Sequence, residues 1–427
     1  MLENLSGKRL LILGGIAPMI EVIERARELG IEVLVTDYLE NSPAKRYADK
    51  SFMVSAIDID AVVELCKEEA VDGIYTGNVD MLLPYYAQIC SRLSLPCYGR
   101  LEHFQIMTDK KRFKELCKQY GVPVVQEYTD LEIKQNAIFY PVIVKPIDSS
   151  GSRGISICRN KAELEKGIQK ALSFSPGKQY IVERYMTGEE VVLYYYFQDG
   201  NPVFASMCDR YVNKQQTGVA QLPTAYIFPS KFIETHITHS NQAIKNMFRE
   251  IGMQDGPIFL QAFIEDGIPY LYEPGYRTNG AREQYIVDAT TGISSVDMLI
   301  NLALTGKMSE KNIELVIDSK LHGKYACKLS PLIREGTIGE IKGIDEIEKL
   351  PSVVKVVLNN YIGDTISDKN VGTLKQIAYR AFIVENTIED LKRTIDYIQN
   401  SVIFFDTSGK SMMLEIFDTN VLLKYYR

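Results

Sequence analysis

The stretch from Tyr140 to Gly154 reads YPVIVKPIDSSGSRG and gives the strongest indication of the fold. β-Branched residues predict a strand near residues 142–144, and Lys145 closes that strand with a positive charge. The small residues that follow can bring backbone N–H groups close to phosphate oxygens, because larger side chains would obstruct that approach. We therefore predict that this stretch binds a nucleoside triphosphate, with a polar turn and an exposed lysine as the alternative. The candidate loop residues are Ser149, Ser150, Gly151, Ser152 and Gly154.

The composition indicates a globular protein that acts on small molecules. With 427 residues the chain is long enough for about two to four domains. The net charge of −7 and the lack of a dense Lys/Arg run interleaved with aromatics argue against a nucleic-acid surface. Seven scattered cysteines without CxxC spacing predict reduced thiols and no disulfide framework. An apolar run only from Leu10 to Leu13 predicts neither a signal peptide nor a membrane span, so we expect a cytoplasmic protein.

Residues 9–98 alternate short apolar strands with helical patterns, which predicts a parallel sheet covered by helices. Gly14 and Gly15 follow the first strand and Asp37 ends the second, as in a dinucleotide-binding fingerprint. The third glycine of that fingerprint is missing, and Pro18 lies in the turn. We interpret the region as a Rossmann-like domain with a tight turn, and nicotinamide binding is the alternative. The expected strands cover residues 9–13, 31–35 and 73–76, and the expected helices residues 19–29, 59–69 and 80–93.

Three helices are expected in the middle of the chain. One runs from Lys161 to about Ser173, and Asn160 and Glu163 resemble a capping box at its start. Thr108 is expected to cap a helix over residues 109–120. A further helix is expected from Phe232 to Ile251, and it carries His236 and His239 one turn apart. Because no third ligand lies nearby, we interpret these histidines as residues of the helix surface, with metal binding as the alternative.

Carboxylates stand at the ends of two predicted strands. Glu183 lies at the end of one strand and Glu190 at the start of the next, which runs to a hairpin turn at Asp199-Gly200. Side chains fixed at such positions can accept hydrogen bonds from an adenine amine and from ribose hydroxyls. A charged surface hairpin is the alternative.

A second hairpin, which Asp266-Gly267 turns, carries oxygen ligands on both of its strands. These are Gln261 and Glu273, and Arg277 follows shortly after. Oxygen ligands suit Mg²⁺, and a permanently charged guanidinium suits a phosphoryl group in transfer. The middle of the chain is therefore expected to be mixed in structure and largely antiparallel.

Together, the order, spacing and chemistry of these motifs resemble the ATP-grasp superfamily. Its members include biotin carboxylase, the large subunit of carbamoyl-phosphate synthetase, purine-pathway ligases, D-alanine ligases and L-amino-acid ligases. The resemblance covers nearly the whole chain and implies a combined α/β and α+β fold. A Rossmann-like pre-ATP-grasp domain would cover residues 1–105. The ATP-grasp core would cover residues 106–318, with a mobile lid at about 123–187, and an α+β C-terminal domain residues 319–427.

For the nucleotide, the resemblance implies contacts along the lid and the core. Lys110 and Lys145 would bind the ATP phosphates, and the loop of residues 149–154 would close over them. Glu190 would bind the ribose hydroxyls. The adenine would be held by Glu183 and by the backbone of the hinge residues after it, Arg184, Tyr185 and Met186.

For the metal and the transferred phosphate, the match is incomplete at one position. Gln261 and Glu273 occupy the metal-ligand positions, for Mg²⁺ or alternatively Mn²⁺, and Arg277 matches the arginine that steadies an acyl phosphate. The family pattern Glu-x-Asn-x-Arg has Gly275 in place of asparagine here, so one usual ligand is absent. Restoring asparagine at position 275 is therefore expected to lower the Mg²⁺ requirement.

The implied activity is that of an ATP-dependent carboxylate–amine ligase, which forms an acyl phosphate and then a C–N bond, and releases ADP and phosphate. Its partners would be a small-molecule carboxylate and an amine, with no nucleic acid and no membrane, and a homodimer is left open. The alternatives are a nucleotide-binding regulator with a degraded metal site, and carboxyphosphate chemistry like that of biotin carboxylase. Arg210 either binds a substrate carboxylate or lies on a solvated hairpin tip. Tyr276 and Arg282 are further candidates to face the substrate.

Overall fold

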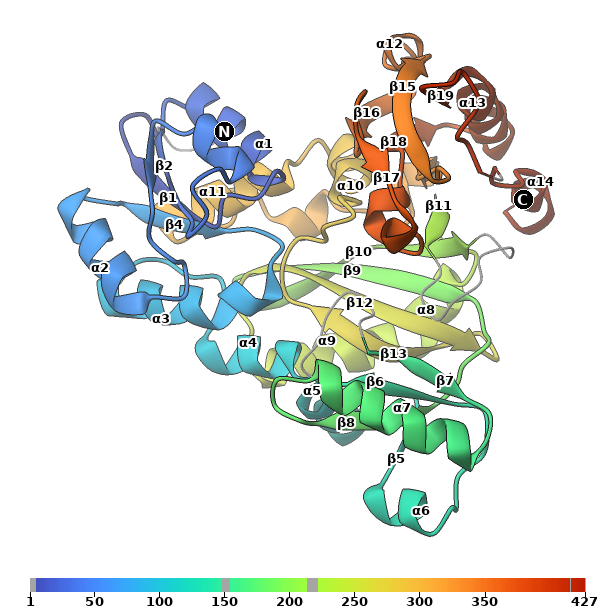
Figure 1. The fold of residues 1–427 in the computed structure, drawn as a ribbon. Coiled ribbons are helices and arrows are strands. Elements are labelled where there is room, and N and C mark those ends of the chain that lie inside the picture. Colours follow the sequence, from blue (N-terminus) through green and yellow to red (C-terminus); the bar gives the residue numbers. More distant parts are fainter. Residues whose placement is uncertain (1–4, 148–153, 213–221, 415, 427) are drawn as a thin grey trace.

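The computed structural model describes residues 5–147, 154–212, 222–414 and 416–426. Figure 1 shows an N-terminal domain (blue), a small sheet with one long helix (green) and a C-terminal region (orange to red) around one large sheet. None of the described helices is long and apolar enough to cross a bilayer. Four of the predicted loop residues lie outside the described residues, namely Ser149, Ser150, Gly151 and Ser152.

The N-terminal domain is a parallel four-stranded sheet in the order β3-β2-β1-β4, which confirms the expected parallel arrangement. The Asp37 carboxylate accepts hydrogen bonds from the N–H groups of Gly15 (2.7 Å) and Leu39 (2.8 Å). This supports the tight turn over nicotinamide binding, because the acid that would bind a ribose already closes its own loop. The elements are β1 (Arg9–Leu13), β2 (Glu32–Thr36), β3 (Lys50–Phe52), β4 (Gly73–Thr76), α1 (Met19–Glu28), α2 (Ile59–Glu68) and α3 (Leu83–Leu93).

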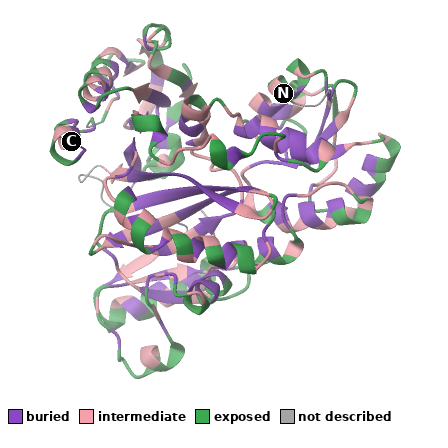
Figure 2. Ribbon diagram, turned by 180° about the vertical axis from the view of Figure 1, so that it is seen from behind, coloured by how far each residue is buried: buried purple, intermediate pink, exposed green. Residues whose placement is uncertain are grey.

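An antiparallel sheet of eight strands, in the order β13-β12-β9-β10-β11-β14-β18-β16, forms the centre of the molecule. It continues past residue 319, because β11 pairs with β14. Figure 2 shows buried residues along its strands and exposed residues on the outer helices. The strands are β9 (Glu190–Gln198), β10 (Asn201–Val212), β11 (Pro223–Phe228), β12 (Gly256–Glu265), β13 (Ile268–Gly275), β14 (Tyr325–Leu329), β16 (Val353–Leu358) and β18 (Tyr379–Glu385).

The small sheet has the order β5-β8-β6-β7 and a hydrophobic core of its own, onto which α7 packs. The start of α7 is fixed as the sequence predicts: the Asn160 side chain accepts from the Glu163 N–H (2.9 Å), and the Arg159 N–H donates to the Glu163 carboxylate (2.8 Å). The elements are β5 (Glu127–Tyr128), α6 (Asp130–Lys134), β6 (Val142–Pro146), β7 (Ser156–Cys158), α7 (Lys161–Phe174) and β8 (Tyr180–Arg184).

Both predicted hairpins are confirmed. Asp199 and Asp266 each have φ of 51°, and the glycines that follow have φ of 78° and 77°. Two successive residues with positive φ form the turn that matches the natural twist of paired strands. The turns set the register of each hairpin near its tip, and a β-bulge farther along each hairpin shifts it by one residue, so that Arg210 pairs with Glu190 and Glu273 pairs with Gln261.

The remaining elements cover the sheets and build the C-terminal region, where a three-stranded sheet has the order β17-β15-β19. They are α4 (Leu101–Thr108), α5 (Lys110–Gln119), α8 (Ile233–His239), α9 (Asn241–Glu250), α10 (Gln284–Thr291), α11 (Ser295–Thr305), β15 (Gly336–Lys342), α12 (Ile344–Ile347), β17 (Thr365–Ile366), α13 (Ile388–Ser401), β19 (Ile403–Asp406) and α14 (Asn420–Tyr425).

Two expectations about helix ends are wrong. Asp109, not Thr108, caps α5, because its carboxylate accepts from the N–H groups of Lys111 (2.9 Å) and Arg112 (3.1 Å). Thr108 instead ends α4, where its hydroxyl donates to the Phe104 carbonyl at 2.7 Å. The helix expected from Phe232 to Ile251 is divided into α8 and α9 at Ser240.

The expectation that His236 lies on a helix surface is also wrong. Its imidazole is fully buried, with Nε2 2.8 Å from the Tyr195 hydroxyl and Nδ1 2.8 Å from the Ser240 hydroxyl. The helices α8 and α9 cover the face of the large sheet that carries Tyr195, so a residue predicted at the surface lies in the core. His239, one turn on, is exposed as expected.

This histidine should make stability depend on pH. Burial lowers the pKa of His236 to about 3, below the ordinary value of about 6.5 in the unfolded chain. The unfolded state therefore binds the extra proton first, and stability falls as the pH drops below about 6.5, by about 2 kcal/mol between about pH 7 and pH 5. Urea denaturation at both pH values should show a smaller acid loss for His236→Gln than for the parent. His239→Gln is the control, and an equal loss in all three proteins would contradict the prediction.

Candidate functional site

A buried carboxylate lies between two lysines where the small sheet meets the core. Glu183 of β8 is 1% exposed. Its Oε1 accepts from Lys114 of α5, and its Oε2 lies 2.7 Å from Nζ of Lys145 of β6 in an ion pair. Lys114 also donates to the Val125 carbonyl at 3.0 Å, whereas the Lys145 side chain keeps 12% of its surface exposed. Lys145 is therefore the member of this cluster that a ligand can reach.

The two lysines keep the Glu183 carboxylate ionised. Burial alone would raise the pKa of Glu183, but the charges of Lys145 and Lys114 outweigh burial and hold this pKa below its ordinary value. Across the sheet on β5, burial raises the pKa of Glu127, and Glu127 forms no ion pair with either lysine among the described residues. The cluster of two cations around one carboxylate suits a phosphate ligand.

The sequence pattern did not single out Lys114. The available signal is its place on the buried side of an amphipathic helix, beside Phe113 and Cys117, where a lysine needs a partner. Lys110, which the resemblance assigns to the phosphates, begins the same helix, and its Nζ lies 3.5 Å from the Ile147 carbonyl. Its contact with phosphate stays a prediction.

Gly154 is the one member of the predicted phosphate loop that the structure describes. Its φ is +77°, and a Cβ there would lie 2.7 Å from both Phe174 Cβ and Pro146 Cγ. Both the conformation and the close packing favour glycine. Local packing and backbone conformation therefore explain why a glycine ends the loop. Its predicted contact with phosphate stays a prediction.

The hinge after Glu183 contains one backbone N–H that has no hydrogen-bond partner in the described part of the chain. Arg184 forms a bidentate pair with Glu265 of β12 (2.8 and 2.7 Å), and the Tyr185 N–H donates to the Pro141 carbonyl at 3.2 Å. Met186 is 6% exposed, and its N–H donates to no described group. A buried N–H of this kind needs an acceptor, and an adenine ring nitrogen is one that fits. Because the Glu183 side chain is committed to the lysines, its own role toward adenine stays a prediction.

Two half-buried, oxygen-bearing side chains are cross-strand partners on the two strands at one end of the large sheet. Gln261 and Glu273 are direct partners across β12 and β13, so they lie on one face. Neither side chain forms a hydrogen bond or ion pair with a described residue. No group of three or more His, Cys, Asp or Glu residues in the described part of the chain can hold a metal ion. These two ligands still fit Mg²⁺, which usually takes one or two protein oxygens and completes its shell with phosphates and water.

Arg210 lies inside β10 rather than on a solvated hairpin tip, so that alternative is wrong. Its side chain is 13% exposed; it pairs with the Glu190 carboxylate and donates to the Tyr272 hydroxyl at 3.0 Å. The two residues are cross-strand partners, and they share the sheet face with Gln261. Their predicted roles, ribose binding for Glu190 and substrate binding for Arg210, stay predictions.

The space that an asparagine at position 275 would need is filled. A Cβ on Gly275 would lie 2.2 Å from the ring of Phe259, its partner on β12. The guanidinium of Arg277 stacks over the same ring, 5.1 Å from its centroid, and binds both oxygens of Asp80 at 2.6 and 2.5 Å. An asparagine at 275 could therefore reach a metal only if Phe259 moves, and the lower Mg²⁺ requirement expected of this change stays a prediction.

The expectation that Tyr276 faces the substrate is wrong. Its side chain is fully buried, and its hydroxyl lies 2.7 Å from the Tyr98 carbonyl and 2.5 Å from that of Asp255. Tyr276 follows Gly275 directly in the chain, so it points to the opposite side of the sheet. Arg282 lies beside the N-terminal domain, where Nη1 is 3.7 Å from the Glu21 carboxylate, and its substrate role stays a prediction.

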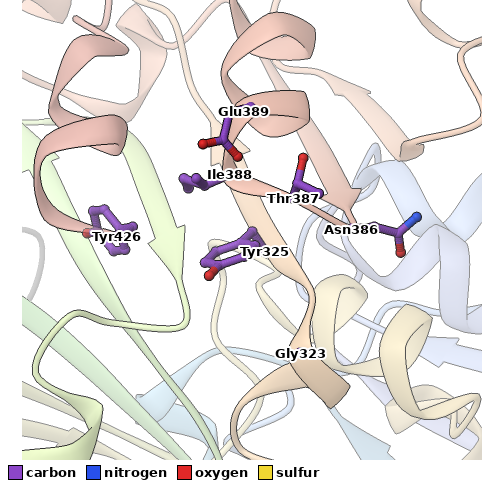
Figure 3. A pocket seen from close by; sticks show the side chains of 7 residues that line it. All are labelled: Gly323, Tyr325, Asn386, Thr387, Ile388, Glu389 and Tyr426. Atoms are coloured by element: carbon purple, nitrogen blue, oxygen red, sulfur yellow. The ribbon is translucent and has the colours of Figure 1, made fainter.

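A separate cavity of about 430 Å³ lies at the start of α13 (Figure 3). None of the predicted site residues lines it, and Thr387 in its wall is the cap of α13. It is therefore distinct from the candidate site. Its lining consists of Gly323, Tyr325, Asn386, Thr387, Ile388, Glu389 and Tyr426.

Comparison with known proteins agrees with this geometry. Residues 138–271 match the family model described as an ATP-grasp domain. The formate-dependent phosphoribosylglycinamide formyltransferase of Sulfurisphaera tokodaii is 31% identical over 208 residues, which cover 45% of this chain and 51% of that protein. The chain thus spans about half the length of this relative.

Solved structures match over almost the whole chain. An L-amino acid ligase from Bacillus licheniformis has a TM-score of 0.75 at 20% identity and covers 94% of this chain and 99% of its own. The biotin carboxylase domain of Hydrogenobacter thermophilus 2-oxoglutarate carboxylase was solved as a dimer with MgADP and bicarbonate. It has a TM-score of 0.73 at 19% identity, over 93% of this chain and 90% of that one.

The chain therefore contains an ATP-grasp domain and has the fold of ATP-grasp ligases. This confirms the expected fold class and the resemblance on which the predicted site residues depend.

The coupling of Gly275 to Phe259 can be tested by stability. Gly275→Asn should destabilise the fold by about 1 to 3 kcal/mol, because the new side chain overlaps the Phe259 ring. Phe259→Val should relieve most of that cost, so the two changes together should cost less than their sum in a double-mutant cycle by urea denaturation. Gly121→Asn is a control for steric overlap, because an added Cβ there meets no atom within 4 Å, although φ is +67° at that position, a conformation that asparagine tolerates. Additive effects of the pair would contradict the overlap.

Proposed function

We propose that this protein is an ATP-dependent carboxylate–amine ligase that works through an acyl phosphate. The observation that carries the proposal is the pair Gln261 and Glu273, cross-strand partners whose side chains form no hydrogen bond or ion pair with a described residue. Lys145 and Arg277 supply positive charge for the phosphates on either side of this pair. The MgADP bound in the Hydrogenobacter thermophilus structure supports Mg²⁺ and adenine nucleotide as the ligands.

In this mechanism the residues either neutralise charge on the phosphates or position the ligands. Met186 and the hinge orient the adenine, while Lys145 neutralises charge on the phosphates. A bound Mg²⁺ supplies further charge neutralisation through Gln261 and Glu273. A substrate carboxylate oxygen attacks the γ-phosphorus, the bond to ADP breaks, and Arg277 stabilises the charge on the phosphoryl group. The amine then attacks the acyl carbon, loses a proton and displaces phosphate.

A nucleotide-binding regulator is the second candidate, and one observation favours it. Phe259 fills the space of a usual third metal ligand, so the metal site holds two protein oxygens. Such a site is still sufficient where triphosphate oxygens and water complete the shell. Measurable turnover of ATP separates the ligase from the regulator.

We propose a small-molecule carboxylate and a small-molecule amine as partners, as for the ligases that share the fold. A homodimer is proposed because the Hydrogenobacter thermophilus domain was solved as one; light scattering tests it. A cytoplasmic location is proposed because all seven cysteines are free and six of them are buried, which suits a reducing compartment.

The reaction class is tested by product analysis. Incubation with MgATP and pooled amino acids, other carboxylates and amines should release ADP and inorganic phosphate, which ³¹P NMR distinguishes from AMP and pyrophosphate. ¹⁸O in the substrate carboxylate should appear in the released phosphate, because the acyl phosphate transfers one oxygen. AMP with pyrophosphate would overturn the mechanism, and ATP binding without turnover would favour the regulator.

A further inference from the structure

A buried cluster of charges lies where the C-terminal region joins the large sheet. Lys328 of β14 donates to Glu283 Oε1 at 2.6 Å, and its Nζ lies 3.4 Å from the centroid of the Tyr226 ring. Both ionic side chains are almost fully buried. Glu283 directly precedes α10, and Figure 1 shows α10 beside β16 and β18.

The cluster shares a face with the candidate nucleotide residues. Glu190, Arg210, Tyr226 and Lys328 are successive partners across β9, β10, β11 and β14. Lys328 is in turn the partner of Phe382 on β18. One continuous row of side chains therefore leads from the predicted ribose carboxylate to the buried cluster.

Arg380 adds a second cation to this face, because it lies two residues before Phe382 on β18. It is 8% exposed, and its one hydrogen bond to a described residue runs from Nη1 to Asn359 Oδ1 at 2.8 Å. Its Nε has no partner among the described residues. The edge formed by Nε and Nη2 is the edge that binds a carboxylate through two parallel hydrogen bonds.

The charge balance around Arg380 calls for an anion. Burial lowers the pKa of Arg380, and the Glu283 charge only partly opposes this shift. Lys328 and Arg380 against Glu283 leave a net charge of +1 in the cluster, and a buried charge without a counter-ion is unfavourable. Ser330 directly follows β14, whose last residue Leu329 pairs with Ala381, the neighbour of Arg380. Ser330 is buried, and its hydroxyl has no partner among the described residues.

We propose that Arg380, with Lys328 and Ser330, binds the carboxylate of a small organic substrate. A group with one negative charge and two oxygens matches both the net charge and the free guanidinium edge, whereas a phosphate dianion would exceed the charge. The assignment of this ligand as a substrate rests on the proposed function. The binding site itself does not, because it is defined without the nucleotide.

The test measures ligand binding to the full chain without ATP. The probes are acetate, L-alanine and succinate, with acetamide, L-alaninamide and succinamide as matched compounds without a carboxylate, and inorganic phosphate as a second oxyanion. Calorimetry and thermal unfolding should detect at least one carboxylate and none of the amides. Arg380→Gln should weaken that binding by about tenfold or more, because a charge-assisted contact is lost, and Arg380→Lys should retain part of it. Arg393→Gln, at a side chain of the same region that is 73% exposed, is the control for charge.

Stability without ligand separates binding from a structural role. Arg380→Gln removes a buried charge that forms no ion pair with a described residue, so its Tm should be equal to or above that of the parent. A large fall in Tm, no carboxylate bound by the parent, unchanged affinity in Arg380→Gln, or phosphate in place of carboxylate would each overturn the proposal. If carboxylate binding depends on Arg380 but no ATP is turned over, the proposed carboxylate site is supported and the proposed ligase activity is contradicted. If the ligase is active and the KM for the carboxylate substrate is unchanged in Arg380→Gln, the ligase activity is supported and the proposed carboxylate site is contradicted.

Discussion

The contact on which the rest of the nucleotide site depends is the Glu183 carboxylate between Lys114 and Lys145. It joins β6 and β8 of the small sheet to α5, so it sets where the small sheet stands against the core. Removing the Glu183 carboxylate would leave the buried Lys114 ammonium without an acidic partner, at a cost of about 3 to 5 kcal/mol. The same contact holds the Lys145 ammonium beside the Tyr272 ring of β13, 5.4 Å from its centroid. Lys145 is therefore both a member of the buried ion pair and the lysine that we expect to bind the ligand.

The large sheet supplies the second constraint. Because side chains alternate along a strand, the register of its hairpins places Glu190, Gln261 and Glu273 on one face. The opposite face carries Tyr195 and packs against α8 and α9. Each acidic or amide side chain on the open face is thus held by a rigid strand, and polar groups without partners on that face mark where ligands are expected.

Local features of the fold could be predicted from the sequence. The hairpins at Asp199 and Asp266 follow from a residue pair that tolerates positive φ, and the start of α7 follows from Asn160 and Glu163. Gln261 and Glu273 could be placed on the two strands of one hairpin, but the turn alone would put Gln261 opposite Tyr272, and a β-bulge makes Glu273 its partner. These predictions hold because the residues concerned lie close together in the chain.

Other features depend on contacts between distant residues, and the sequence did not reveal them. Lys114 is explained only by Glu183, and the burial of His236 only by the sheet that it packs against. Tyr276 was placed near the substrate because it is next to Arg277, although neighbours on a strand face opposite ways. Arg380 lies far along the chain from every motif, and only the pairing of β14 with β18 brings it to the sheet face that carries Glu190 and Arg210.

The central claim is that Lys145 binds the phosphates of a nucleotide while Glu183 holds it in place. Calorimetry of MgATP binding to the parent, to Lys145→Met and to Lys178→Met tests it most directly, with circular dichroism to confirm folding. The account predicts that Lys145→Met weakens binding by about tenfold or more, since a charge-assisted phosphate contact is lost, and that Lys178→Met changes nothing. Equal affinity in all three folded proteins would contradict it.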